Sequence, residues 1–253
     1  MDKRIALQLY SIREHIAEDF WGSLRQVKEC GYNAVEFAGY FDHSAQELKE
    51  GLAELDLEPL SSHVGFDLLR DTPEEVALFS EELGLSFVVC PSADLSTIEK
   101  IEEAGRVFRH MTELLEPKGI GFGYHNHDYE FKTLDDGRVI LDVLLEQGKE
   151  YGLLAEIDTC WAEVGGVDAP EYIQGLGQQA GPLHFKDLKK NYDPVKRDVD
   201  TVLGTGVVDF QRIIKDGEAS GILERGVVVE QEGFEGNPFD ELKAAVDYIR
   251  GIW

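Results

Sequence analysis

The sequence contains few cysteines, few basic residues and no long apolar segment. The three cysteines (Cys30, Cys90 and Cys160) are far apart and form no CxxC pair, which suits a reducing cytosol. No apolar run approaches the roughly 18 residues that indicate a membrane span, and the first residues lead directly into a strand-like segment at 5–10. We therefore expect neither a membrane helix nor a signal peptide, and a cytoplasmic location without a membrane partner.

Basic residues are outnumbered: 24 Lys and Arg face 50 Asp and Glu, which gives a formal net charge of −26. Such a surface repels phosphate backbones, so nucleic acid is excluded as a partner on electrostatic grounds. Two explanations of the charge stay open. It suits a salt-rich cytoplasm, where screening tolerates dense acidic surfaces, or it belongs to a very soluble acidic enzyme.

Eight apolar, strand-like segments alternate with amphipathic, helix-like segments along the whole chain. The predicted strands are 4–10, 33–38, 57–64, 85–91, 119–127, 153–159, 181–187 and 226–232. The predicted helices are 16–30, 44–55, 72–83, 94–117, 138–150, 168–179, 209–220 and 238–251. No linker or low-complexity tract divides the 253 residues. The pattern predicts a single domain over 1–253 with the (β/α)8 fold, the TIM barrel.

Local signals support this assignment. Ser44 with Glu47 forms a capping-box pattern, and Asp168 and Asp209 precede further helices. A doubly wound open sheet is the alternative, but it requires a glycine-rich phosphate turn after the first strand, and residues 8–13 (QLYSIR) do not form one.

Polar or charged residues follow or end seven of the eight predicted strands. The carboxyl ends of the strands of a barrel meet at one mouth, so these groups are expected to converge. The candidate residues at the strand ends are Gln8, Glu36, His63, His125, His127, Glu156, Asp158, His184, Lys186, Glu230 and Glu232. Charged side chains at such positions are costly to bury unpaired, and a metal ion satisfies several of them at once.

The segment 119–131 (GIGFGYHNHDYEF) contains the densest group of these residues. Strand alternation places His125 and His127 on one face, and Glu130 follows within reach. Two histidines in an H-x-H pattern are also compatible with a loop that satisfies both imidazoles, so this pattern alone leaves both interpretations open.

Six segments together resemble the sugar phosphate isomerase/epimerase family of xylose isomerase-like TIM barrels. They are 7–11 (LQLYS), 31–36 (GYNAVE), 124–131 (YHNHDYEF), 157–161 (IDTCW), 184–187 (HFKD) and 204–210 (GTGVVDF). The resemblance covers essentially the whole chain, but it does not specify a substrate, since the group includes epimerases, isomerases, dehydratases and a DNA-repair endonuclease branch.

The resemblance implies a metal centre with one carboxylate from strand five, an aspartate from strand six, a histidine from strand seven and a glutamate from strand eight. The last three fall on Asp158, His184 and Glu230. The sequence departs from the family at strand five, where His125 occupies the matching position and Glu130 is the nearest acid. We predict His125 as the fourth ligand, with Glu130 as the alternate. Imidazole and carboxylate ligands suit one divalent ion such as Mn²⁺, Zn²⁺, Co²⁺, Fe²⁺ or Mg²⁺, and the sequence does not choose among them.

Such a site predicts a metal-dependent sugar isomerase or epimerase that works through an enediolate. His127 and Glu130 are the candidate bases, and Glu230 shares that role as a ligand beside the substrate. Lys186 either hydrogen-bonds a developing oxyanion or neutralises nearby acids.

Four further residues are candidates for substrate binding. For Gln8, Glu36 and His63, recognition of sugar hydroxyls competes with structural hydrogen bonding between strand ends. For Trp161, stacking on a sugar ring competes with core packing.

The partner implied by this reading is a small carbohydrate. A lyase or dehydratase acting on a keto-sugar or keto-inositol is the second hypothesis, because the histidine pair could protonate a leaving group. A barrel that binds a sugar without turnover is the third. The sequence leaves open whether the chain forms a homo-oligomer.

Overall fold

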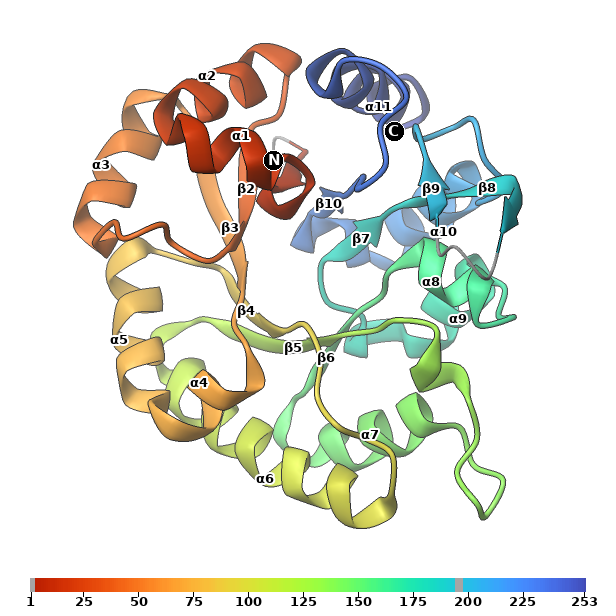
Figure 1. Cartoon of the computed structure of the whole chain (residues 1–253). Helices are drawn as coiled ribbons and strands as arrows, with labels where there is room; N and C mark the ends of the chain where they lie inside the picture. Colours follow the sequence, from red (N-terminus) through yellow and green to blue (C-terminus); the bar gives the residue numbers. More distant parts are fainter. Residues whose placement is uncertain (1–2, 194–197) are drawn as a thin grey trace.

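A computed structural model describes residues 3–193 and 198–253 of the chain (Figure 1). Its barrel strands are β1 (Ile5–Gln8), β2 (Ala34–Ala38), β3 (Glu58–His63), β4 (Phe87–Cys90), β5 (Gly121–His125), β6 (Leu154–Glu156), β7 (Leu183–Phe185) and β10 (Val227–Val229). Every one of them lies within a predicted strand, and helices surround the strands on the outside (Figure 1). The predicted (β/α)8 barrel is confirmed.

The eight strands form one parallel sheet in the order β6-β5-β4-β3-β2-β1-β10-β7. The two ends of this sheet meet, because parallel bridges join Asp158 to His184 and Ala155 to Ala180. The backbone N–H of His184 donates to the carbonyl of Ile157 at 3.0 Å across the same junction. Since the sheet closes on itself, the carboxyl ends of all eight strands surround a single mouth.

The helices of the described residues include those predicted, one of which is divided in two, and two short additional ones. The full set is α1 (Arg13–Glu18), α2 (Phe20–Cys30), α3 (Ala45–Glu54), α4 (Phe66–Asp71), α5 (Pro73–Leu83), α6 (Ile98–Leu115), α7 (Ile140–Gly148), α8 (Thr159–Val164), α9 (Ala169–Leu176), α10 (Phe210–Ser220) and α11 (Pro238–Ile252). Helices α4 and α8 were not predicted because each is only six residues long and follows a strand end. The predicted helix 16–30 is divided at Asp19 into α1 and α2. The capping box of Ser44 and Glu47 is confirmed at the start of α3.

A second difference concerns the segment after strand seven. The chain forms an antiparallel pair of strands there, β8 (Asp187–Asp193) and β9 (Asp198–Thr201), where the sequence analysis assigned no element between the strand 181–187 and the helix 209–220. Residues 194–197, between these two strands, lie outside the described residues. Glu232 and Gly233 donate backbone N–H groups to Asp200 Oδ2 at 2.6 and 3.1 Å, so this strand pair is joined to the loop after β10.

The apolar core has two parts. The larger part fills the space between the strands and the helices. The smaller part fills the lower barrel interior with Ala6, Ala34, Leu60, Phe87, Val89 and Val228. Two residues further along β1 and β2, the inward positions are polar, namely Gln8 and Glu36, so the interior changes from apolar to polar toward the mouth. No helix in 3–193 or 198–253 combines the length and apolar character that crossing a bilayer requires.

Candidate active site

The predicted strand-end residues converge in the upper barrel interior as two adjoining groups. The outer group consists of Asp158, His184 and Glu230, and the inner group consists of His63, His125, Glu156 and His184. Within each group, one nitrogen or oxygen atom from every member lies within 4.8 Å of the others. His184 belongs to both.

Strand register explains this division. His125 on β5 is directly opposite Glu156 on β6, whereas the bridge partner of Asp158 is His184 on β7. Asp158 therefore lies two residues nearer the mouth than Glu156 and its strand partner His125. The alternation of side chains along a strand places Glu156 and Asp158 on the same face, but the register between strands decides which side chain on the neighbouring strand each one contacts.

The outer group has the donor atoms of a divalent-metal site. His184 Nδ1 lies 3.6 Å from Asp158 Oδ2 and 3.7 Å from Glu230 Oε2, too far for hydrogen bonds. Both His184 Nδ1 and Asp158 Oδ2 are buried without a hydrogen-bond partner in the described part of the chain. Two ligand atoms on one ion, each about 2.1 Å from it in tetrahedral directions, are roughly 3.4 Å apart. The residues present therefore fit a metal ion.

Helix α8 fixes the orientation of Asp158. The carboxylate caps this helix through its other oxygen, since Asp158 Oδ1 accepts from the backbone N–H of Trp161 at 2.8 Å. The backbone N–H of Asp158 in turn donates to the Asn126 side chain at 3.1 Å. With Oδ1 used in the cap, Oδ2 is directed to His184.

Lys186 lies beside the outer group and is only 1% exposed. Its ammonium donates to Glu230 Oε2 at 3.1 Å and to Glu232, and it lies 5.4 Å from the centre of the Trp161 ring. Burial alone would lower the pKa of Lys186, but Glu230, Asp158 and Glu232 together raise it well above its usual range. The lysine is therefore a fixed cation next to the outer group.

In the inner group, three imidazoles surround one carboxylate. Glu156 Oε2 is 2.7 Å from His63 Nε2 and 3.0 Å from His125 Nδ1. Burial and the nearby Glu36 raise the pKa of Glu156 to about 7. Burial lowers the pKa of His125 well below its usual range, and the imidazoles of His184 and His63 lower it further. Burial would also lower the pKa of His63, but Glu36 and Glu156 raise it.

Gln8 and Glu36 are held in internal hydrogen bonds. Gln8 Nε2 donates to Glu36 Oε1 at 2.7 Å, and Gln8 Oε1 accepts from the backbone N–H of Tyr10 at 2.9 Å. Glu36 Oε1 also lies 3.0 Å from His184 Nε2, and Ser61 donates to Glu36 Oε2 at 2.5 Å. Both side chains are fully buried, so this geometry favours structural hydrogen bonding over hydroxyl recognition.

The two candidate bases lie in different surroundings. The His127 ring is 5.2 Å from the His125 ring and 5.7 Å from Trp161, and His127 Nδ1 is buried without a hydrogen-bond partner among the residues described. Both oxygens of Glu130 are used elsewhere, because Tyr124 donates to Oε1 at 2.7 Å and the His127 N–H donates to Oε2 at 2.9 Å. Tyr124 faces helix α6, so Glu130 lies behind the strand. The structure brings His127, but not Glu130, to the mouth.

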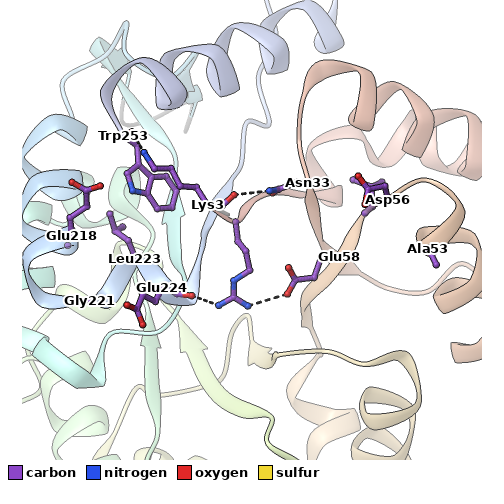
Figure 2. Close-up of a pocket in the computed structure, with 13 residues that line it drawn as sticks. Lys3, Asn33, Ala53, Asp56, Glu58, Glu218, Gly221, Leu223, Glu224 and Trp253 are labelled. Carbon is purple, nitrogen blue, oxygen red and sulfur yellow. Dashed lines mark hydrogen bonds and ion pairs between the residues drawn. The ribbon is translucent and has the colours of Figure 1, made fainter. Parts of the chain in front are cut away.

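A cavity of about 1130 Å³ lies at the opposite end of the barrel (Figure 2). It is lined by residues at the amino-terminal ends of the strands, including Lys3, Arg4 and Glu58. Arg4 is already paired there with Glu58 at 3.2 Å and with the carbonyl of Glu224. Catalytic groups of barrels gather at the carboxyl ends of the strands, so we place the active site at the mouth instead.

Sequence reasoning gave no role to Glu156, although its alternation with Asp158 placed it on the inward face. It also could not identify Asp187 as a structural residue. The carboxylate of Asp187 accepts the backbone N–H groups of Gly204, Gly206 and Val208 at 2.9, 2.8 and 3.1 Å. The motifs 184–187 and 204–210 are therefore parts of one local structure.

Comparisons with known proteins agree with this fold. Residues 24–252 match the family model described as "Xylose isomerase-like TIM barrel". Two solved structures of sugar phosphate isomerase/epimerases from Parabacteroides distasonis are similar. One is 25% identical, with a TM-score of 0.83 and 98% of each chain covered. The other is 22% identical, with a TM-score of 0.84, covering 99% of this chain and 94% of that one. A structure of L-ribulose 3-epimerase has a TM-score of 0.73 at 14% identity, covering 98% of this chain and 94% of that one. A search among curated proteins found no match.

Proposed function

Because the chain belongs to the xylose isomerase-like TIM barrel family, as its motifs suggested, we propose that it is a divalent-metal-dependent isomerase or epimerase of a keto-sugar or sugar derivative. The observation that supports this most directly is the outer group. There, Asp158 Oδ2 and His184 Nδ1 are buried and unpartnered within the described residues, and Glu230 lies beside them. Buried polar atoms of this kind require a partner, and a cation provides one for all three residues.

In this proposal Asp158, His184 and Glu230 hold the ion. An ion bound there supplies a Lewis acid that polarises a sugar carbonyl and acidifies the neighbouring C–H group. The prediction that His125 is the fourth ligand remains open, since its Nδ1 faces Glu156 in the inner group.

We assign the proton transfer to His127. Its imidazole lies beside His125 and Trp161 at the mouth, and its Nδ1 has no protein hydrogen-bond partner among the described residues. Imidazole is a common general base and acid in enzymes, so His127 can accept the substrate proton and return it. Removal of the proton next to the carbonyl gives an enediolate. Its return to the opposite face gives the epimer, and its return to the neighbouring carbon gives the isomer.

Lys186 and Trp161 complete the substrate site in this proposal. The ammonium of Lys186 is held by Glu230 and Glu232 and stabilises the negative charge that develops on the substrate oxygen. The ring of Trp161, next to both Lys186 and His127, offers an apolar face for the sugar.

The test is exchange of the substrate's α-proton with solvent in D₂O, over a panel of ketoses, keto-glycosides and inosones. His127→Gln is expected to retain its metal, measured by mass spectrometry, and to lose exchange by about 10²-fold or more. Glu130→Gln is the matched control and should lose much less. If His127→Gln exchanges the proton at the normal rate and Glu130→Gln does not, Glu130 is the base. An unsaturated product would identify the lyase alternative instead.

A further inference from the structure

The inner group is an unusual layer for the interior of a barrel. The layer below it is apolar, as is common in this fold, and contains Phe87, Val89 and Val228. Directly above lie three imidazoles and two carboxylates from five strands. His184, Glu36 and Glu156 are fully buried, His125 is 3% exposed and the His63 side chain is 11% exposed. Burying this many polar groups is favourable only when each one has a partner.

The protein alone does not provide all of these partners. Glu156 Oε2 is hydrogen-bonded to both His63 Nε2 and His125 Nδ1, but Glu156 Oε1 is buried with no hydrogen-bond partner in the described ranges. The three rings face the same small volume, because their centroids are 4.7 to 5.5 Å apart in all three pairings. Three imidazoles and one carboxylate are a ligand set that transition-metal ions bind.

His184 connects this layer to the outer group through opposite edges of one ring. Its Nδ1 faces Asp158 and Glu230, whereas its Nε2 lies 3.0 Å from Glu36 Oε1 on the inner side. Both nitrogens of one imidazole bind cations only when the ring has lost its N–H proton, so filling the inner site releases the ring N–H proton of His184 to solvent. A ligand set on the inner side therefore does not compete with the outer group for the same atom.

We propose a second divalent-cation site in the inner group, formed by His63, His125, Glu156 and the Nε2 atom of His184. Its imidazole-rich donor set selects an ion of the Zn²⁺ or Co²⁺ class over Mg²⁺ or Ca²⁺, which prefer oxygen ligands. The cation neutralises the buried carboxylates Glu36 and Glu156, and it orients the ring of His184 toward the outer group. This site goes beyond the proposed reaction and does not depend on it.

The test is the number of ions bound per chain. Metal-free full-length protein is equilibrated with Zn²⁺, freed of excess by gel filtration, and analysed by mass spectrometry. The wild type is expected to hold about two ions, and His63→Gln and Glu156→Gln, which alter only the inner group, about one. Glu230→Gln, which alters only the outer group, should also hold about one. His110→Gln is the matched control, because His110 is about half exposed and lies 3.7 Å from Glu74, and it should hold about two.

Titration with Co²⁺ provides a second readout that does not depend on enzyme turnover. Glu230→Gln should still show the visible d–d absorption of a nitrogen-rich Co²⁺ site, and His63→Gln should lose that component. One ion per chain in the wild type, with the same single ion in both inner-group variants, would overturn the proposal. So would the absence of the Co²⁺ band from a folded Glu230→Gln protein, with folding checked by circular dichroism.

Discussion

Replacing Asp187 by alanine is expected to destabilise the protein by about 3–5 kcal/mol. The buried carboxylate accepts three backbone N–H groups from the segment that follows β9, those of Gly204, Gly206 and Val208. A buried donor left without its partner costs about 1–3 kcal/mol. Three such losses sum to about 3–9 kcal/mol, and water that reaches the partly buried glycine N–H groups keeps the cost in the lower part of that range, about 3–5 kcal/mol.

The asparagine variant separates the hydrogen bonds from the charge. Two of the three N–H groups point to Asp187 Oδ2 and one to Oδ1. Asn can place its side-chain oxygen where Asp187 Oδ2 lies. Only the hydrogen bond from the Val208 N–H is then lost, which costs about 1–2 kcal/mol. Burial also raises the pKa of Asp187, so removing the charge recovers part of this loss.

The assay is urea unfolding of the wild type, Asp187→Asn and Asp187→Ala, followed by circular dichroism. The control is Asp209→Ala, which removes an N-cap of α10 and should cost about 1 kcal/mol. Equal stabilities of the alanine and asparagine variants would refute the reasoning, because the shared acceptor oxygen would then contribute nothing.

Three further predictions concern other parts of the site. Gly206→Ala should destabilise by about 1–3 kcal/mol in the same unfolding assay, because its Cβ would lie 2.3 Å from Asp187 Oδ1 and from the Leu188 carbonyl; an unchanged midpoint would contradict this. Burial raises the pKa of Glu130, so the folded protein binds this proton more tightly than the unfolded chain, and the ionised form is penalised above about pH 4. The unfolding free energy of the wild type minus that of Glu130→Gln should therefore decrease from pH 4 to pH 8, and an increase would contradict the assignment. Removal of metal by a chelator should lower the midpoint of thermal unfolding of the wild type, and Asp158→Asn should show a smaller change.

Several features of the fold and site could be predicted because they depend on local sequence. Strand periodicity located all eight barrel strands, and the Ser44–Glu47 pattern located the start of α3. Barrel closure follows from the count of βα units, and it brings Asp158, His184 and Glu230 together, as the family resemblance implied. Prediction of short elements failed, because a six-residue helix such as α8 has too few turns to produce a periodic signal.

The sequence by itself determined the strands and the faces of their side chains, because alternation acts over a few residues. It also determined the family, because the motifs that carry the resemblance are short segments of the chain. Only the tertiary structure decided the depth of each side chain in the barrel. The register between β5 and β6 sets His125 against Glu156, and the bridge from β6 to β7 sets Asp158 against His184. Register between strands is a property of the closed sheet, so no local pattern encodes it. For the same reason, the contact between Asp187 and residues 17 to 21 positions later became visible only in the folded chain.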